Sequence, residues 1–555
     1  GGVSTRAALT VALVVALACR TALQVVGGGA PQLWVASIGV AAVVTWWCVA
    51  ARELGDVLVA GSLAGVAVAA TTHAALGTWA AVWRADVWAW LLLLAQAALV
   101  VVALRTPPTD TSRPASRRQA VVVLPGMLLA GMWAANPARA TAESGTVGAA
   151  VVVAAALLAV GVALAPPAGR FVSVIAALCL VVGTTWVMVP GHSSDWQSAA
   201  YVVGMPALAV LRRRIPDGDT EVGSSPAPAF AAGGGALLWV ILLFVYYAGY
   251  DLGYRADLLL VAVAVVIGGL GVAGRPPAAA VTALHHPFLG IPVLGVGVAA
   301  ALLGPLITVP ASVMELHAHE GLRVMAWNLR MGYGMDGTFD VDGVARTIAA
   351  EEPDVVLLSE VDRGWLLNGG QDQLALLGRT LDLDVHFGPA ADPVWGDAIL
   401  TRLPVDDVDS VALEPFGAVT GAQVLAATVS KDDVAYEVLS THVQPHEDPV
   451  DGSREQAMAI ADYAQRRFDR SGNPVVFGGD FNLQPGDPSW DQIINDGFVD
   501  ALSGARPLMT SPADAPEQQI DHVFASGDLH ASDPGLVPTE LSDHLPVLVT
   551  VYPLD

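Results

Sequence analysis

Long apolar stretches recur throughout residues 1–310, and short segments that are polar or rich in proline and glycine separate them. A helix needs about 20 apolar residues to cross the ~30 Å hydrocarbon core of a bilayer. Only helices and closed barrels cross it, because each peptide group there must be hydrogen-bonded within the protein. The pattern therefore predicts an α-helical polytopic membrane domain. About eleven transmembrane helices are expected, at residues 7–26, 33–51, 56–75, 86–104, 119–136, 146–165, 171–190, 196–211, 229–250, 256–274 and 288–309.

Arginines mark one side of these expected spans. Arg105, Arg113 and Arg118 follow the fourth span, Arg212 follows the eighth and Arg275 follows the tenth, so all share one side if eleven spans alternate. Lys and Arg accumulate in cytoplasmic loops. We therefore expect an integral, multi-pass cell-membrane protein whose N-terminus is cytoplasmic and whose C-terminal domain is extracytoplasmic. An error of one span in the count would reverse this orientation.

Charge divides the chain near the last expected span. Residues 1–310 contain 11 acidic and 15 basic residues, whereas residues 311–555 contain 41 and 12, so their net charges are +4 and −29 within a total of −25. An acidic surface repels nucleic-acid backbones, and sequence-independent DNA binding depends on Lys and Arg. Stable binding to duplex DNA is therefore not expected of the C-terminal part.

From Glu320 the hydrophobic pattern changes to alternating short strands and helices. Residues 322–329 alternate as in a strand, residues 341–351 have helical spacing, and PDVVLLSE is an apolar strand that ends at Glu360. We expect an α/β domain over residues 321–555, joined to the membrane domain by a linker at residues 311–320. Further strands are expected in DAILTR, AQVLAATVS, VAYEVLSTH, NPVVFGGDFN, QQIDHVFAS and HLPVLVTVY, with a helix at residues 453–469.

Acids, an amide and an imidazole end several of these apolar runs. Asp480 and Asn482 follow a buried strand and a Gly-Gly turn, two positions apart, so they project to one side. They could position a water and a phosphoryl oxygen, although Asp and Asn also occupy turns for local hydrogen bonding. Asp543 and His544 offer a carboxylate for a hard cation and an imidazole for proton transfer. Glu360 needs a partner or a cation, because burying an unpaired charge is costly.

These strings together resemble the endonuclease/exonuclease/phosphatase superfamily, which has the DNase I-like fold. The resemblance covers residues 321–555 and implies a four-layered α/β sandwich with a Mg²⁺ or Mn²⁺ site at one edge of paired sheets. It implies hydrolysis of a phosphoester by in-line attack of water on phosphorus. The matching strings, in order, are NLR at 328, SEVD at 359, GDAILTRLPV at 396, STH at 440, GGDFN at 478, QIDHVF at 519 and SDHLPV at 542.

The resemblance also implies a role for each matching metal or phosphate residue. Glu360 looks like the principal metal ligand, with Asn328 beside it and Asp543 nearby. His442 looks like an imidazole that contacts the phosphate and stabilises the transition state or protonates the leaving group.

A second set of matching residues would act on the water and the scissile phosphate. Asp480 and Asn482 resemble the pair that orients them. Asp521 resembles an acid that orients an imidazole, and His544 is the imidazole it would orient. Either Asp480 or His544 could serve as the general base.

Two further residues are candidates for substrate binding. Asp397 stands where many members of the superfamily have asparagine in a GNAILSR string, so a carboxylate replaces an amide that hydrogen-bonds to substrate. Arg454 could contact an anionic substrate, although an ion pair on a helix face is the alternative role. His522 follows Asp521 where an aromatic residue or arginine is common, and we expect it at the surface.

A narrower resemblance concerns the substrate. The strings NLRMGYGMDGTFDVDG and GWLLNGG, together with the polytopic N-terminal region, look like the eukaryotic proteins that remodel the lipid of GPI anchors and their prokaryotic relatives. This resemblance implies a lipid-linked or glycolipid phosphodiester at the membrane surface. The expected function is thus a membrane-anchored, metal-dependent phosphodiesterase or phosphatase. The alternatives are an outward-facing nuclease and a lipid-binding, transport or sensor protein with an inactive appended domain.

Overall fold

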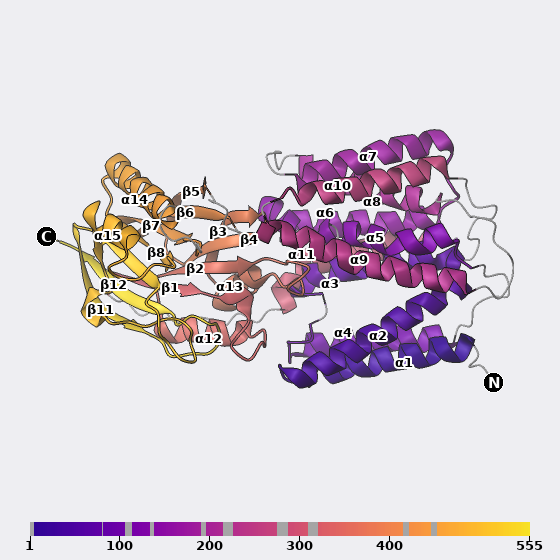
Figure 1. The fold of residues 1–555 in the computed structure, drawn as a ribbon, viewed down its shortest axis with the longest axis horizontal. Helices are drawn as coiled ribbons and strands as arrows, with labels where there is room; N and C mark the ends of the chain where they lie inside the picture. Colours follow the sequence, from indigo (N-terminus) through magenta and orange to yellow (C-terminus); the bar gives the residue numbers. More distant parts are fainter. Residues whose placement is uncertain are drawn as a thin grey trace. The chain divides into compact units, whose positions relative to one another are not determined.

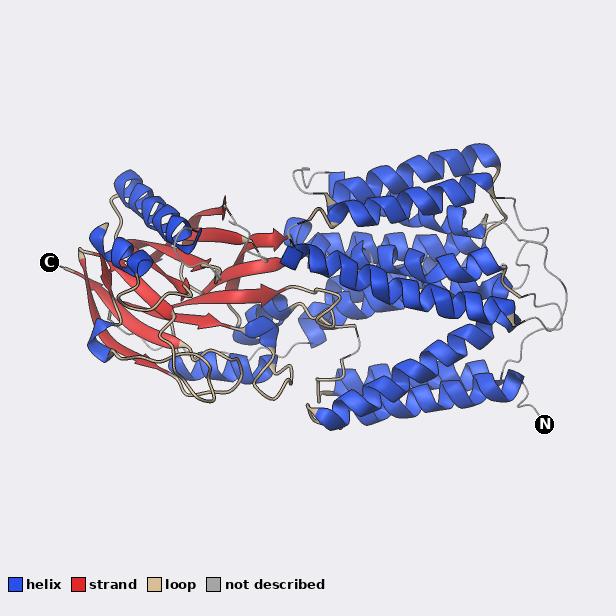
Figure 2. Ribbon diagram, in the orientation of Figure 1, coloured by secondary structure: helices blue, strands red, loops and turns tan. Residues whose placement is uncertain are grey.

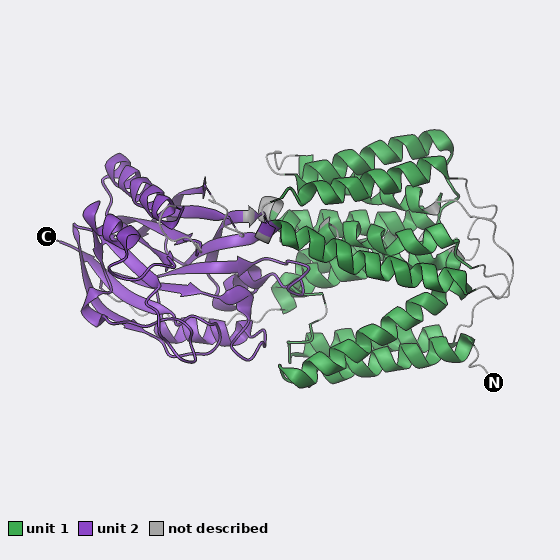
Figure 3. Ribbon diagram, viewed as in Figure 1, with its two compact units in different colours: residues 1–249, 254–308 green, residues 250–253, 309–555 purple. Residues whose placement is uncertain are grey.

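The protein divides into two compact units, residues 1–249 with 254–308 and residues 250–253 with 309–555 (Figure 3). The expected linker lies outside the described residues except for Glu320, as do Arg113 and Arg275 of the expected cytoplasmic cluster. The computed structural model describes residues 5–79, 81–105, 114–133, 138–189, 196–214, 226–252, 254–274, 287–308, 320–414, 421–445 and 452–554.

The described part of the first unit contains eleven α-helices (Figure 1). They are α1 (Thr5–Leu23), α2 (Ala30–Glu53), α3 (Gly55–Leu76), α4 (Val87–Arg105), α5 (Arg117–Trp133), α6 (Ala138–Leu164), α7 (Arg170–Met188), α8 (Gln197–Arg213), α9 (Ala227–Leu252), α10 (Asp257–Ala273) and α11 (Pro287–Thr308).

Eight of these helices are long and apolar enough to cross a membrane, within the residues that the structure describes. The other three, α5, α8 and α10, are 17 residues long. Two arginines begin α5 and two end α8, so the apolar part of each helix is shorter than the helix itself. Each of these two helices also contains an internal proline. Length and composition therefore support eight of about eleven expected spans, and they make the first unit a multi-pass membrane region.

Large apolar side chains stay exposed on the outside of this helical unit. Contiguous exposed apolar surface on a protein marks contact with a partner or with lipid. Here it is spread over several of the candidate spans, as expected of helices that face hydrocarbon. Examples are Trp34, Leu94, Phe171, Phe230 and Ile291.

The second unit contains two mixed six-stranded sheets (Figure 2). The strand order is β11-β12-β1-β2-β4-β3 in the first sheet and β5-β6-β7-β8-β10-β9 in the second. The strands are β1 (Leu322–Asn328), β2 (Val355–Asp362), β3 (Asp384–Asp392), β4 (Trp395–Thr401), β5 (Val405–Leu413), β6 (Ala422–Lys431), β7 (Val434–His442), β8 (Val475–Asp480), β9 (Phe498–Asp500), β10 (Asp521–Ser526), β11 (Leu529–Leu536) and β12 (Val547–Pro553).

The two sheets pack face to face and helices cover their outer faces. Apolar residues of both sheets, such as Val324 and Val476, form one core between them. Ile460 of α14 (Gly452–Ser471) and Ile493 of α15 (Pro488–Asn495) pack on the outer face of the second sheet. On the first sheet, α13 (Gln373–Leu381) contacts β2 and β3, and α12 (Val341–Glu351) contacts α13. The expected four-layered α/β sandwich is confirmed.

Parallel pairing places the ends of the central strands at one edge of this sandwich. β1 and β2 are parallel neighbours, with Asn328 opposite Ser359. β7 and β8 are also parallel, with His442 opposite Asp480. Alternate residues of β1 before Asn328 lie in the core between the sheets, so its side chain continues the inward face of the strand. Polar side chains from both sheets can therefore meet at this edge.

Candidate functional site

Glu360 leaves the regular pattern of β2 at a bulge. Pairing between β2 and β4 shifts register between Leu358 and Val361, and Glu360 has a φ of 53° in the left-handed region. A non-glycine residue in this conformation costs on the order of 1–3 kcal/mol, so the surrounding structure must hold it. Bulges of this kind re-aim side chains and occur next to active sites.

Asn328 joins the carboxylates of the two sheets. Its Nδ2 donates to Oε1 of Glu360 at 3.1 Å and to Oδ2 of Asp480 at 2.9 Å. Its Oδ1 accepts the backbone N–H of Arg330 at 3.0 Å, which fixes the orientation of the amide. Ser542 donates from Oγ to the Asn328 carbonyl at 2.7 Å. The amide of Asn328 is thus held with both hydrogens directed at acids.

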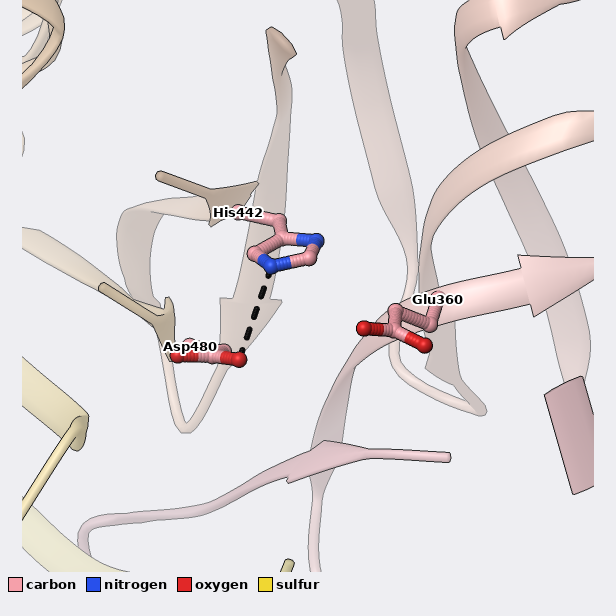
Figure 4. A group of neighbouring side chains, drawn as sticks. All are labelled: Glu360, His442 and Asp480. Carbon is pink, nitrogen blue, oxygen red and sulfur yellow. Dashed lines mark ion pairs between the residues drawn. The ribbon is translucent and has the colours of Figure 1, made fainter. Parts of the chain in front are cut away.

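His442 and Asp480 face Glu360 from the ends of β7 and β8 (Figure 4). The distance from Nε2 of His442 to Oδ2 of Asp480 is 3.5 Å. Asn482 has its Nδ2 3.2 Å from the same imidazole nitrogen and donates from its backbone N–H to Oδ1 of Asp480 at 2.9 Å. Three side chains of the second sheet therefore form one polar group that can contact a phosphoryl oxygen and a water.

Asp521 orients His544. The first residue of β10, Asp521, pairs across the sheet with Asp480 and has its Oδ2 2.8 Å from Nδ1 of His544. Nε2 of His544 is then 3.7 Å from Oδ2 of Asp480. Burial alone would lower the pKa of His544, but the carboxylates of Asp521 and Asp480 raise it to about 10. The imidazole is therefore a cation at neutral pH in this arrangement.

Two overlapping groups of side chains could hold a cation. One consists of Glu360, His442 and Asp480, and the other of Asp480, Asp521 and His544; within each group the ligand atoms lie within 4.8 Å of one another. Burial raises the pKa of Glu360, although His442 and Asn328 lower it. Oδ1 of Asp521 is buried without a hydrogen-bond partner among the described residues. Carboxylate oxygens with imidazole nitrogens fit a hard divalent cation such as Mg²⁺ or Mn²⁺.

The remaining expected residues lie differently. Asp543 is half-buried with its Oδ2 3.6 Å from Nε of Arg330, and it is in neither cation-binding group. Arg454 is exposed on the first turn of α14, and it has no hydrogen bond or ion pair to the cluster among the described residues.

Asp397 is buried, and Nε2 of Gln423 donates to its Oδ2 at 2.5 Å. Burial raises the pKa of Asp397 to about 6, opposed by His442 and Gln423.

The expectation of a surface position for His522 was wrong. This residue is fully buried in β10, between β8 and β9, and its ring lies 6.4 Å from that of Trp490. Its Nε2 is 2.8 Å from the Leu483 carbonyl, and Arg506 donates from Nη2 to Nδ1 at 2.6 Å. Burial and the charge of Arg506 lower the pKa of His522 to about 4. It is a neutral imidazole that supports the sheet.

The sequence pattern did not predict the residues that brace the cluster. Ser359, next to Glu360, donates from Oγ to the Thr441 carbonyl at 3.3 Å and accepts from the backbone N–H of Asp480 at 3.4 Å. Ser542 lies in the SDH string and braces Asn328 as described above. A buried serine directly before an expected functional acid was the available signal in both strings.

The comparison with protein families agrees with this description. Residues 325–544 match the model of the Endonuclease/Exonuclease/phosphatase family. Similar solved structures include an endonuclease/exonuclease/phosphatase from Beutenbergia cavernae, at 24% identity over 42% of this chain and 72% of that one, with a TM-score of 0.36. A mannosyl-6-phosphatase from Bacteroides thetaiotaomicron is 17% identical over 42% of this chain and 99% of its own, with a TM-score of 0.36.

A further similar structure is truncated TDP2 from Caenorhabditis elegans, at 19% identity over 42% of this chain and 98% of that one, with a TM-score of 0.35. None of the curated proteins matches the chain. Residues 325–544 are an endonuclease/exonuclease/phosphatase family domain, and the described residues before it include eight helices long enough and apolar enough to cross a membrane.

Proposed function

We propose that this protein is a membrane-anchored, divalent-cation-dependent phosphodiesterase or phosphatase. The observation that carries the proposal is the position of Asp480, which belongs to both groups that could hold a cation. Asn328 joins it to Glu360 across the two sheets, and two imidazoles lie within 4 Å of it. Such a set of acids, amides and imidazoles at one sheet edge is suited to hydrolysis at phosphorus.

Each polar side chain then has a defined part in the reaction. A bound Mg²⁺ or Mn²⁺ would neutralise charge on the phosphoryl oxygens and polarise the ester. Glu360 and Asp480 would hold the cation, with Asn328 fixing the distance between them. His442 would donate to a phosphoryl oxygen or to the leaving group.

The other side chains would act on the attacking water. Asn482 is held by Asp480 and by the Val443 carbonyl, so its amide has a fixed direction for orienting the scissile phosphate. Asp480 would accept the water proton, because Asp521 keeps His544 protonated at neutral pH. His544 would then stabilise the negative charge that develops at phosphorus.

The membrane region supports a lipid-linked or glycolipid phosphoester as the substrate. The eight candidate spans would hold the catalytic domain at a membrane surface, where lipid headgroups are concentrated. The strongly acidic balance of residues 311–555 disfavours a nucleic-acid duplex. The arginine clusters support an extracytoplasmic catalytic domain, and the reaction would then take place at the outer membrane surface.

The direct test is hydrolysis by the full chain purified in detergent. Mg²⁺-dependent product release from bis-p-nitrophenyl phosphate, lysophospholipids and single-stranded DNA would be compared for wild type, Glu360→Ala and His544→Ala. We expect both variants to lose about 100-fold or more of the turnover of the phosphodiester. Asp462→Ala, an exposed acid on α14, is the matched control and should keep wild-type turnover. Undiminished turnover in both site variants would refute the site, and preferred cleavage of DNA would favour the nuclease alternative.

A further inference from the structure

Asp397 is a buried residue of β4 beside Glu360. Pairing between β2 and β4 runs from Leu358 opposite Ala398 to Val361 opposite Gly396, so Asp397 faces the bulge that contains Glu360. Its side chain is 3% exposed and accepts a hydrogen bond from the backbone of Glu360. The carboxylate is thus in contact with the strained residue of the bulge.

Gln423 approaches the same carboxylate from the other sheet. Gln423 is fully buried in β6 and donates from Nε2 to Oδ2 of Asp397 at 2.5 Å. Its Oε1 accepts from Oγ of Ser410 at 3.4 Å, and Nε2 is also 3.5 Å from the Ser440 carbonyl. A Cβ at Gly388 would lie 2.3 Å from Oε1, so glycine is needed there to admit the amide. Gln423 is therefore held in one direction.

We propose that Asp397 is a positioning residue, which fixes the Glu360 carboxylate by holding its backbone in the bulge, with Gln423 as a strut from the second sheet. This inference rests on the proposed function, in which Glu360 holds the divalent cation. It replaces the expected contact between Asp397 and substrate. The two donors that meet at Asp397 explain the carboxylate, because it can accept from both at once.

A positioning role for Asp397 and a contact between Asp397 and substrate predict different effects on cation binding and on substrate binding. Supporting groups behind a metal ligand usually change metal affinity by about 10–100-fold when they are removed. Loss of Asp397 should therefore weaken cation binding and leave the KM for substrate at saturating cation nearly unchanged. Loss of a substrate contact would raise that KM and leave cation binding unchanged.

The experiment measures Mn²⁺ binding to the full chain in detergent, from the electron paramagnetic resonance signal of free Mn²⁺. We expect Asp397→Ala to weaken Mn²⁺ binding about tenfold or more. Asp397→Asn should retain more of the affinity than Asp397→Ala, because its amide oxygen can still accept from the Glu360 backbone. Gln423→Ala should lie between the two. Asp462→Ala on α14 is the control, and thermal unfolding confirms that each variant is folded.

The outcomes distinguish this inference from the proposed function. Unchanged Mn²⁺ affinity with a raised KM for bis-p-nitrophenyl phosphate in Asp397→Ala overturns the inference. If that variant does not fold, Gln423→Ala decides, and wild-type Mn²⁺ affinity in folded Gln423→Ala overturns the inference. Unchanged Mn²⁺ affinity in Glu360→Ala instead refutes the proposed cation site, whatever the Asp397 variants do.

Discussion

Asn328 at the end of one sheet donates a hydrogen bond to Asp480 at the end of the other, at 2.9 Å. The same nitrogen donates to Glu360, so two carboxylates that would repel each other share one amide. This contact makes the cluster depend on how the two sheets pack. It also makes Asn328 a residue whose loss should affect both activity and stability.

We expect Asn328→Ala to lower turnover about 100-fold and to destabilise the catalytic domain by about 1–3 kcal/mol, because two buried carboxylates lose their donor. Turnover of bis-p-nitrophenyl phosphate and thermal unfolding of the purified chain would measure the two effects. Asn495→Ala, at the exposed end of α15, should match wild type in both. A variant with wild-type turnover would show that the amide does not organise the acids.

Removal of divalent cations should destabilise the catalytic domain. Glu360, Asp480 and Asp521 bring three carboxylates to one edge, and a bound cation would reduce their repulsion. A ligand at about 100 times its Kd stabilises a folded protein by about 2.7 kcal/mol. We expect a chelator to lower the unfolding temperature and Mg²⁺ to restore it, and Glu360→Ala to abolish this response. Identical unfolding temperatures with and without Mg²⁺ would argue against a cation in this cluster.

Asp521→Asn should move the alkaline limit of activity to lower pH. Asp521 and Asp480 raise the pKa of His544 to about 10, and activity that needs the imidazolium is lost as pH rises through that pKa. Without Asp521, the pKa falls, and the alkaline limb should shift down by about one unit or more. Profiles of kcat against pH for wild type, Asp521→Asn and the exposed control Asp491→Asn would measure the shift. Movement of the acid limb instead would identify His544 as the general base.

The sequence pattern predicted the interior strands of both sheets and none of the four edge strands. β3 and β11 are the edges of the first sheet, and β5 and β9 are the edges of the second. An interior strand is buried on both faces and reads as an apolar run, whereas an edge strand is partly solvated. β5, with the sequence VDDVDSVAL, is exposed along most of its length, so its acids conceal the strand.

The candidate site was predictable where polar residues end apolar strands, and not where contacts cross between the sheets. Glu360 and Asp480 stand out because each ends an apolar run. That Asn328 contacts both depends on the packing of the sheets, which no local pattern records. Gln423 is a single amide in the strand AQVLAATVS, and only its contact with Asp397 gives it a role.

The extracytoplasmic placement of the catalytic domain can be tested by cysteine labelling. Asp462 is exposed on α14, and after Cys19, Cys48 and Cys179 are changed to serine an Asp462→Cys variant has one reactive thiol. We expect an impermeant thiol reagent to label it on intact cells, because in the proposed orientation the arginine clusters lie on the opposite, cytoplasmic side. A cysteine at Arg118, exposed at the start of α5, should be labelled only after permeabilisation. The reverse pattern would invert the proposed orientation.

The buried His522 should make the catalytic domain sensitive to acid. Its pKa is about 4 in the folded protein and 6.5 when unperturbed, so below pH 6.5 the unfolded chain takes up a proton that the folded chain does not. Stability should therefore be lost as pH falls from about 6.5 to about 4, by on the order of 3 kcal/mol at most. Arg506 prevents protonation of Nδ1 by donating to it, and the Leu483 carbonyl lies against Nε2.

His522→Gln is the matched variant, because its amide can still donate to the Leu483 carbonyl and does not titrate in this range. Chemical unfolding of wild type and variant at pH values between about 4 and 7 would give the stability difference at each pH. We expect the stability advantage of the wild type over the variant to shrink as pH falls from about 6.5 to about 4, and then to reverse. The reason is that only the wild type gains a proton on unfolding in this range. A difference that is independent of pH would mean that His522 is protonated in the folded protein or that acid opens β10 before global unfolding.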